Sequence, residues 1–462
     1  MTLTAAPESA IRARRREQRG WMFYDWANSA YATTVAAVFL GPTLDAMAKQ
    51  AACQQRGLNG AACEAAENVP LEFLGITLNY DSWFPYILGL SILVQIVVLP
   101  ITGAVADRSR RKTYILALFA YIGAVATMLM YFVADGRFLL GWALYLVANM
   151  AFGASIVVYN AFLPEISTPD ERDKISARGW ALGYLGGGLL LGANLALFGV
   201  HEALGLSAGH AARISLLSAG LWWALFTLIP VSRLRSRRGV MPLTGAGIVS
   251  GGFRQLTRTL RGARAYPRTL LFLAAYLFYN DGIQSVILLT AVYAVNELGF
   301  GQSTIIVAIL LAQFVAFAGA LVLARLARLL GAKRVVLGSL VLWTLVVAAA
   351  YFLEERATTQ FFALAALIGF VLGGSQALSR SLYSQMIPRG EEAEYFSLYE
   401  ISERGTSWLG AVTFATVNQL TGSYRAAILS LVAFFVVGFS LLAAVNVRRA
   451  IVEAGNVPPE RV

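Results

Sequence analysis

The sequence predicts an all-α integral membrane protein with twelve transmembrane helices in two six-helix pseudo-repeats. Hydrophobic residues make up 58% of the chain and charged residues only 14%, which is too apolar for a soluble domain. Short polar motifs occur twice inside the apolar runs: residues 23–26 (FYDW) return at 278–281 (FYND), and residues 159–164 (YNAFLP) return at 383–388 (YSQMIP). Repeated spans of this kind are typical of transporters whose site lies between two halves.

Apolar windows of about 20 residues define the predicted spans. They cover residues 21–46, 82–106, 113–134, 138–163, 176–200, 212–231, 268–295, 302–325, 335–353, 359–386, 395–420 and 425–447. The polar stretch at 50–80 has no counterpart in the second half, and this insertion explains the different spacing of the two repeated pairs. The chain therefore divides into an N-terminal six-helix bundle (1–231), a basic cytoplasmic linker (232–266) and a C-terminal six-helix bundle (267–462).

Positive charge is concentrated in alternate loops, and this bias predicts the orientation. With a cytoplasmic N-terminus, the lysines and arginines left outside are Lys49, Arg56, Arg137, Arg213, Arg356 and Arg425. Both termini are therefore expected in the cytoplasm. The basic stretch at 12–19 leads into a first span without a small-residue cleavage site, so we expect no cleavable signal peptide.

The linker at 232–266 is rich in arginine. Phe253, Leu256 and Leu260 fall at helical spacing among the arginines, which fits a short interfacial helix on the inner leaflet. A solvated linker fits equally well. The net charge of +11 does not indicate nucleic-acid binding, because the positive charge lies in short stretches between spans. The expected contact of these residues is membrane lipid.

The two cysteines, Cys53 and Cys63, both fall in the first outer loop. An oxidising exterior favours a disulfide between them over two free thiols. His201 and His210 fall in another outer loop and are expected to be solvated. The sequence has no metal-ligand spacing and no GxxxxGK[ST] loop for ATP phosphates. We therefore expect no metal, no cofactor and no enzymatic activity, since no nucleophile–base pair is visible.

The loop between the second and third spans (GAVADRSRRK) has the residues of a gate. Gly103 permits close approach of two helices, and Asp107 is placed to bond to a neighbouring helix terminus or an arginine. The basic residues hold the loop at the inner surface. The predicted gate residues of this loop are Gly103, Asp107, Arg108, Arg111 and Lys112. The motif resembles the signature loop of the major facilitator superfamily.

The resemblance to that signature loop is incomplete in one place. Arg110 stands where the family usually has a second glycine. The counterpart in the second half, residues 325–334 (RLARLLGAKR), keeps Gly331 and the basic residues but lacks the aspartate. An ion-pair latch is therefore expected in the first half alone. The alternative is that these charges only follow the positive-inside rule.

Four polar motifs lie inside spans and follow one another along the chain. They are FYDWANSAY (23–31), FYNDGIQSVI (278–287), GGSQALSRSLYSQMIP (373–388) and EISERGTSW (400–408). Together they resemble the autophagy-related vacuolar amino-acid effluxers of fungi and their bacterial relatives, over the whole chain. The resemblance implies the twelve-helix major facilitator fold and export of amino acids. For a bacterial relative, the expected location is the inner (plasma) membrane.

Placing an ionisable side chain inside a span costs about 2.5–3.5 kcal/mol of membrane-insertion free energy, so such a side chain needs a partner or a water-filled cavity. Asp281 is expected near mid-depth of the seventh span, and Asp25 nearer the inner end of the first. Because the repeat matches these spans, we expect the two aspartates to face each other across a central cavity. The alternative for each is a buried structural hydrogen bond. The predicted substrate and proton site comprises Asp25, Asn28, Asn160, Asn280, Asp281, Gln284, Gln376 and Arg380.

A second group of charges is expected to act as gate contacts between the halves or as structural pairs. Glu400, Glu403 and Arg404 share one helical face, and pairing of Arg404 with Glu400 makes the cluster nearly neutral. Arg178 occupies the matching place in the first half.

These features favour a secondary transporter of a small polar solute that works by alternating access. The resemblance implies that the solute is an amino acid and that it is exported. We expect a monomer, with protonation of Asp25 or Asp281 as the coupling step. One alternative is a broad-specificity drug or metabolite exporter, which aromatic residues lining the cavity would favour. Another is a non-transporting membrane sensor on the same scaffold.

Overall fold

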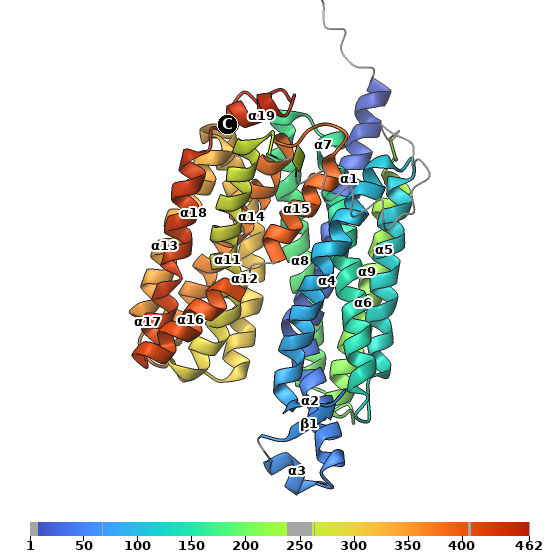
Figure 1. Ribbon diagram of the computed structural model, residues 1–462, viewed down its shortest axis with the longest axis vertical. Helices are drawn as coiled ribbons and strands as arrows, with labels where there is room; N and C mark the ends of the chain where they lie inside the picture. The colour runs from blue at the N-terminus through green and yellow to red at the C-terminus, as the bar shows by residue number, and fades with distance from the viewer. Residues whose placement is uncertain (1–7, 67, 238–260, 263, 405–407, 462) are drawn as a thin grey trace, which may run out of the picture.

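The computed structural model describes residues 8–66, 68–237, 261–262, 264–404 and 408–461. Two bundles of long helices lie side by side (Figure 1). The start of the first helix and the C-terminus lie at the same end of the molecule, which we call the terminal end.

The first bundle is formed by the helices that precede residue 238. These are α1 (Glu8–Ala30), the π-helical η1 (Tyr31–Phe39), α2 (Leu40–Gln55), α4 (Trp83–Arg108), α5 (Lys112–Leu129), η3 (Met130–Phe132), α6 (Phe138–Ala161), α7 (Leu163–Ile166), η4 (Pro169–Glu171), α8 (Arg172–Gly199) and α9 (Ala208–Arg233).

The second bundle is formed by the helices that follow residue 266. These are α11 (Pro267–Asn296), α12 (Gln302–Leu330), α13 (Ala332–Tyr351), α14 (Thr358–Gln385), α15 (Glu392–Arg404), α16 (Trp408–Thr421), α17 (Tyr424–Ser430), α18 (Val432–Ala444) and α19 (Val447–Glu453). The possible interfacial helix in the linker falls mostly on residues 238–260, outside the described residues.

The first helix is longer than its predicted span of 21–46. Helical structure runs without a break from Glu8 through η1 to Gln55. The residues before position 20 are mainly Ala, Arg, Glu and Gln, which are strong helix formers, so the helix begins well before the apolar run. The apolar window therefore predicted only part of this helix.

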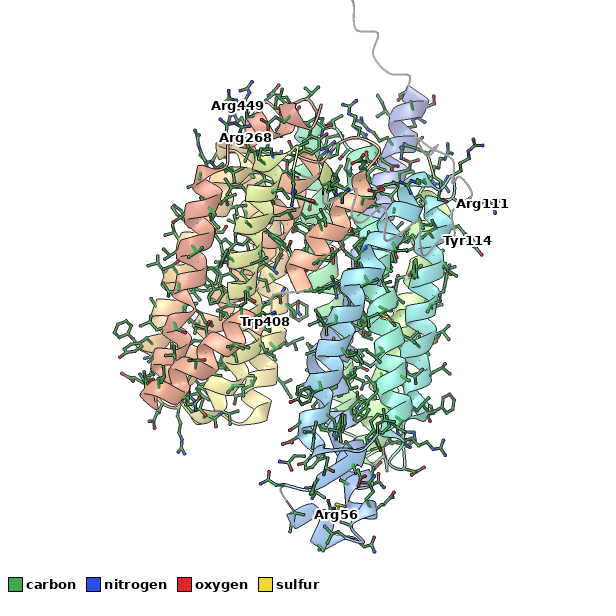
Figure 2. The ribbon with its side chains drawn as sticks, viewed as in Figure 1. Arg56, Arg111, Tyr114, Arg268, Trp408 and Arg449 are labelled. Atoms are coloured by element: carbon green, nitrogen blue, oxygen red, sulfur yellow. A yellow bond between two sulfur atoms is a disulfide. The ribbon has the colours of Figure 1, made fainter. Side chains whose placement is uncertain are left out.

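The loop between α2 and α4, predicted to lie outside, contains the only strands in the described chain. A short helix, α3 (Ala61–Ala65), precedes the antiparallel hairpin of β1 (Pro70–Phe73) and β2 (Ile76–Asn79). Cys53 and Cys63 are joined by a disulfide. Arg56, labelled in Figure 2, marks this region at the end opposite the terminal end.

Ten helices in the described residues are long and apolar enough to cross a membrane. The two predicted spans outside this set are the first and the eleventh. The first carries Asp25 and Asn28, which lower its hydropathy. The eleventh is represented by α15 and α16, which flank the undescribed residues 405–407 and are each shorter than 18 residues. The count of twelve spans and the limits of the two bundles therefore stay predictions.

The two bundles meet along a few helices. From the first bundle, α8 packs against α12 and α14, while α4 and α6 pack against α15. Within the second bundle α12 and α14 approach to backbone contact, because a Cβ on Gly369 or Gly373 would clash with the carbonyl of Ala312 or Ala316. This close packing fixes the face of α14 that meets the first bundle.

Candidate functional site

An ion pair between the two bundles forms the centre of the candidate site. The guanidinium of Arg380 on α14 lies beside the carboxylate of Asp25 on α1, with Nη2 3.0 Å from Oδ2 and Nη1 3.4 Å from Oδ1. The side chains are only 3% and 10% exposed. Arginine and a carboxylate match in this bidentate geometry, so the contact fixes the orientation of the two side chains as well as the distance between them.

The remaining polar atoms of this pair are also hydrogen-bonded. Arg380 donates from Nε to the hydroxyl of Ser176 on α8, at 3.0 Å, and from Nη2 to the Ser176 carbonyl, at 2.9 Å. The Tyr159 hydroxyl on α6 donates to Asp25 Oδ2 at 2.7 Å. Burial of charge is tolerated only when its hydrogen bonds are made, and these contacts supply them inside the protein.

Aromatic rings surround the Arg380 guanidinium. Its central carbon lies 4.8 Å from the Trp21 ring centroid, 5.3 Å from Trp180 and 5.5 Å from Tyr159. Trp21 also donates a hydrogen bond to the Tyr159 carbonyl at 2.8 Å. The rings attract the cation and exclude water from it. Gly179 completes the enclosure, since any Cβ there would collide with the Asp25 carboxylate.

A chain of hydrogen bonds continues from Arg380 to α15. Asn160 on α6 accepts from Arg380 at 3.4 Å and donates to Glu400 at 3.0 Å. Glu400 accepts in turn from Arg404 at 3.3 Å, in the pairing that their spacing predicts. The Arg404 guanidinium lies over the ring of Phe152, 4.8 Å from its centroid. Asn160 therefore links α14 and α15 of one bundle to α6 of the other.

A second polar network lies within the C-terminal bundle. Gln376 donates to Asn280 at 2.8 Å, and Asn280 donates to the carbonyl of Glu403 at 3.0 Å. The Tyr276 hydroxyl contacts both Gln376, at 3.3 Å, and the Glu403 carboxylate, at 3.0 Å. This network joins α11, α14 and α15 beside the ion pair, and it brings together predicted residues from three different motifs.

Asp281 does not belong to either network. Its Oδ2 accepts a hydrogen bond from the backbone N–H of Gly410 on α16 at 2.8 Å. Asp25 pairs with Arg380 instead, so the expected face-to-face arrangement of the two aspartates is replaced by two separate environments. Asn28 is buried and Gln284 is half-buried, and neither joins the two networks. The repeat predicted matched helices, but it could not predict which partner each carboxylate meets.

The signature loop closes the terminal end of the interface. Asp107, at the end of α4, accepts hydrogen bonds from the backbone N–H groups of Ala393 and Glu394, at 3.0 and 2.9 Å. These N–H groups belong to the first turn of α15, so the carboxylate meets the positive end of a helix in the other bundle. Arg108 adds an ion pair to Glu394 at 3.9 Å. At Gly103 a Cβ would lie 2.5 Å from the Ala393 carbonyl oxygen, so only glycine permits this approach.

Lys112 anchors Asp107 from its own bundle. Its ammonium lies 3.2 Å from Asp107 and 2.7 Å from Glu165. Glu165 also pairs with Arg237, which lies 2.7 Å from Glu17 on α1. This set of charges holds α1, the end of α4, the start of α5 and α7 together within the first bundle.

Two predicted gate residues lie away from the interface. Arg111 is exposed, and Figure 2 shows it extending outward near the terminal end. Arg178 is exposed beside a basic cavity of about 290 Å³ near the start of α8. Their sequence positions beside Asp107 and opposite Arg404 suggested contact between the bundles, but each side chain points to the surface.

Several side chains of the site were not predicted from the sequence. They are Trp21, Ser176, Gly179, Trp180 and Tyr276. Their residue types are common in apolar helices, so no local pattern marks them. Tyr159 begins the repeated YNAFLP motif, and that repeat is the one signal that pointed to it. Within the described residues no group of three His, Cys, Asp or Glu side chains is placed to hold a metal ion.

The chain matches a known family over nearly its whole length. The family model described as "Vacuole effluxer Atg22 like" matches residues 13–455. The chain belongs to this Atg22-like family. The MFS-type transporter YxiO of Bacillus subtilis is 30% identical, over 93% of this chain and 94% of its own. Autophagy-related protein 22-1 of Penicillium rubens is 25% identical, over 94% of this chain and 90% of its own.

Solved structures agree on the fold. A bacterial homologue of the iron transporter ferroportin, in an outward-facing state, has a TM-score of 0.64 at 15% identity and covers 94% of this chain and 98% of its own. The E. coli fucose:proton symporter FucP has a TM-score of 0.64 at 12% identity and covers 94% of this chain and 99% of its own. This Atg22-like protein is therefore a multi-pass membrane transporter with the major facilitator fold.

Proposed function

We propose that this Atg22-like transporter exports a small zwitterionic solute, an amino acid, by secondary active transport with alternating access. The observation that carries the proposal is the buried Asp25–Arg380 pair between the two bundles. An amino acid carries an ammonium and a carboxylate of its own. It can therefore offer a new partner to each member of this pair.

Exchange of partners links binding to movement. Removing one member of a buried ion pair leaves an unpaired charge and costs about 3–5 kcal/mol, which keeps the bundles together when no solute is bound. A zwitterion that meets Arg380 with its carboxylate and Asp25 with its ammonium removes that cost. The two bundles are then free to separate at the terminal end, as alternating access requires.

The contacts at the terminal end fit a closed gate. Asp107 holds the first turn of α15, and Gly103 lets α4 approach α15 directly. With both termini in the cytoplasm, as the positive-inside rule predicts, the described conformation is closed toward the cytoplasm. For a relative of a Bacillus transporter we place the protein in the bacterial plasma membrane.

We propose protons as the coupling ion, and the membrane carboxylates support this proposal. A solute that moves against its gradient without ATP needs an ion gradient. Protonation of Asp25 weakens its pairing with Arg380, so uptake of a proton there favours release of the bundles. Asp281 is the second candidate for the coupling proton, because it is buried inside a span.

Reconstituted transport tests the proposal. Purified protein is screened by thermal shift against amino acids, peptides, sugars and nucleosides, because a ligand that binds the native state raises the melting temperature. A stabilising amino acid is then followed as a radiolabelled solute in proteoliposomes with an imposed pH gradient. We expect uptake by the wild type and by Arg111→Gln, and none by Arg380→Gln. Equal uptake by Arg380→Gln, or stabilisation by sugars or nucleosides alone, contradicts the proposal.

The alternative of a broad-specificity exporter has less support. It requires aromatic side chains that line a solute cavity. In the described conformation Tyr24, Tyr31, Tyr159 and Tyr279 are each at most 1% exposed and pack between helices. A dye-efflux assay in cells separates the two functions, and we expect no efflux of hydrophobic cationic dyes.

A further inference from the structure

A cluster of five arginines, four of them without an acidic partner among the described residues, lies where α1 begins and α9 ends. Arg12, Arg15, Arg16, Arg19 and Arg233 line a cavity of about 520 Å³ at the terminal end. α1 and α9 touch here, because a Cβ on Gly20 would lie only 2.6 Å from the Cβ of Arg233. The contact places the last residue of one membrane-spanning helix beside the arginines that precede the apolar part of another.

The charge of this cavity is not balanced by the protein. Among the described residues only Arg12 of this set has an ion pair, to Glu8, and both side chains are more than three-quarters exposed. The sequence stretches 1–7 and 238–260, which lie outside the described residues, contain no Asp or Glu and so have no carboxylate side chain to offer. Like charges held together without counter-charge repel, and an anionic ligand relieves that repulsion.

A neighbouring cavity provides a contrast. It shares Arg15 and Arg19 with the first but also includes Glu171, which pairs with Arg14 at 3.3 Å. Glu171 also caps the turn that precedes α8. That cavity is also basic, since Lys174 and Arg178 line it too, but it contains a carboxylate, whereas arginines alone line the cavity between α1 and α9.

Next to the arginines, α1 and α9 meet through aromatic side chains. Phe23 and Trp26 follow Arg19 at helical spacing on α1, and both are half-buried. Trp26 stacks on Trp222 of α9, with ring centroids 5.4 Å apart, and contacts Phe226 at 5.7 Å. Aromatic side chains beside a basic cluster are typical of the membrane–water interface. A phospholipid contacts both the arginines and these rings, whereas a free phosphate fills the arginine cavity alone.

We propose that this arginine cavity binds the headgroup of an anionic phospholipid, with the acyl chains against the half-buried aromatic side chains of α1 and α9. Arginine suits a phosphodiester because its planar fork donates two hydrogen bonds to phosphate oxygens. The bound lipid bridges the start of α1 to the end of α9, and it thereby stabilises the helix that carries Asp25.

Lipid binding to the full-length protein tests this inference. The protein is placed in phosphatidylcholine nanodiscs with increasing phosphatidylglycerol, and bound phosphatidylglycerol is quantified at low salt. We expect the triple variant Arg16→Gln, Arg19→Gln, Arg233→Gln to bind it at least about tenfold more weakly than the wild type, since each arginine near an anionic surface adds attraction. The matched control removes three exposed arginines at the same end of the other bundle: Arg334→Gln, Arg448→Gln, Arg449→Gln. It should stay within about twofold of the wild type.

A measurement on the wild type keeps the test independent of the variants' folding. A photoreactive phosphatidylglycerol should crosslink to peptides of α1 and α9, and excess phosphatidylcholine should not compete. Three outcomes overturn the inference. They are crosslinks confined to other helices, an equal loss of binding in the control variant, and full competition by inorganic phosphate, which would indicate a site for free anions.

Discussion

Asp25 and Asp281 lie in the two copies of the repeated motif, one position apart when the copies are aligned, and they have different kinds of partner. Asp25 pairs with Arg380 of the other bundle and accepts a hydrogen bond from Tyr159. Asp281 accepts one hydrogen bond from the backbone of Gly410, inside its own bundle. The motif's carboxylate is thus an interface contact in the first half and a local contact in the second. Only the first of these two contacts depends on the relative position of the bundles.

The two loops that follow the second and eighth predicted spans differ in the same direction. In the first, Asp107 bonds to the positive end of α15 across the interface. In the second, Lys333 donates to the carbonyls of Ala443 and Val445 at the negative end of α18, at 2.8 Å each, within its own bundle. In each loop the charged side chain is opposite in sign to the helix terminus that it contacts. Asp107 meets the positive N-terminal end of α15, and Lys333 meets the negative C-terminal end of α18. Only the first loop can hold the bundles together.

The largest effect should come from breaking the pair at Asp25. Arg380→Gln and Asp25→Asn should each lower the free energy of unfolding by about 3–5 kcal/mol, because each leaves an unpaired buried charge. The double variant should recover part of that loss, since no charge is then unpaired. Denaturation of the four purified proteins in detergent measures the coupling. Additive losses in the double variant would show that the two side chains do not interact.

The next largest effect should come from Asp107. In Asp107→Ala the N–H groups of Ala393 and Glu394 lose their acceptor. Each buried donor left unsatisfied should lower the stability of the closed conformation by about 1–3 kcal/mol. The terminal end should then open more often. Ala393 is fully buried, so a cysteine placed there reports opening through its rate of labelling by a water-soluble thiol reagent. We expect faster labelling in Asp107→Ala and an intermediate rate in Asp107→Asn, which keeps one side-chain acceptor.

A smaller effect is expected at Asp281. Its carboxylate accepts one backbone hydrogen bond, so Asp281→Asn should cost about 1 kcal/mol in unfolding free energy. It should leave the labelling rate at position 393 unchanged, in contrast to Asp25→Asn. If both asparagine variants speed labelling equally, the two carboxylates are equivalent and the comparison between them fails.

The smallest effect is expected at Lys333. Lys333→Gln weakens contacts with the last carbonyls of α18 and should cost about 0.3–1 kcal/mol, the usual range for a charge at a helix terminus. Transport should stay near the wild-type rate, because no contact between bundles is lost. A reduction in transport as large as that of Asp107→Ala would show that the second loop also takes part in the gate.

The helical class could be predicted from the length of the apolar runs. The polar residues inside the spans could be predicted because a charged side chain in an apolar run is costly and therefore indicates a function. The sequence also predicted the local pair of Glu400 and Arg404, since helical spacing alone brings them together. It could not predict the partner of Arg380, because that depends on how α14 and α1 pack. Trp21, Trp180 and Ser176 were missed for the same reason. In Arg111 and Arg178 the charge was visible in the sequence, but the direction of the side chain was not.

The central claim is that Arg380 holds the terminal end closed by pairing with Asp25. Spin labels at Arg111→Cys on the first bundle and Arg448→Cys on the second, both exposed, report the separation of the bundles there by double electron–electron resonance. The account predicts a shift to longer distances in Arg380→Gln without any solute, and the same shift in the wild type when a transported amino acid is added. An unchanged distance distribution in Arg380→Gln would contradict it.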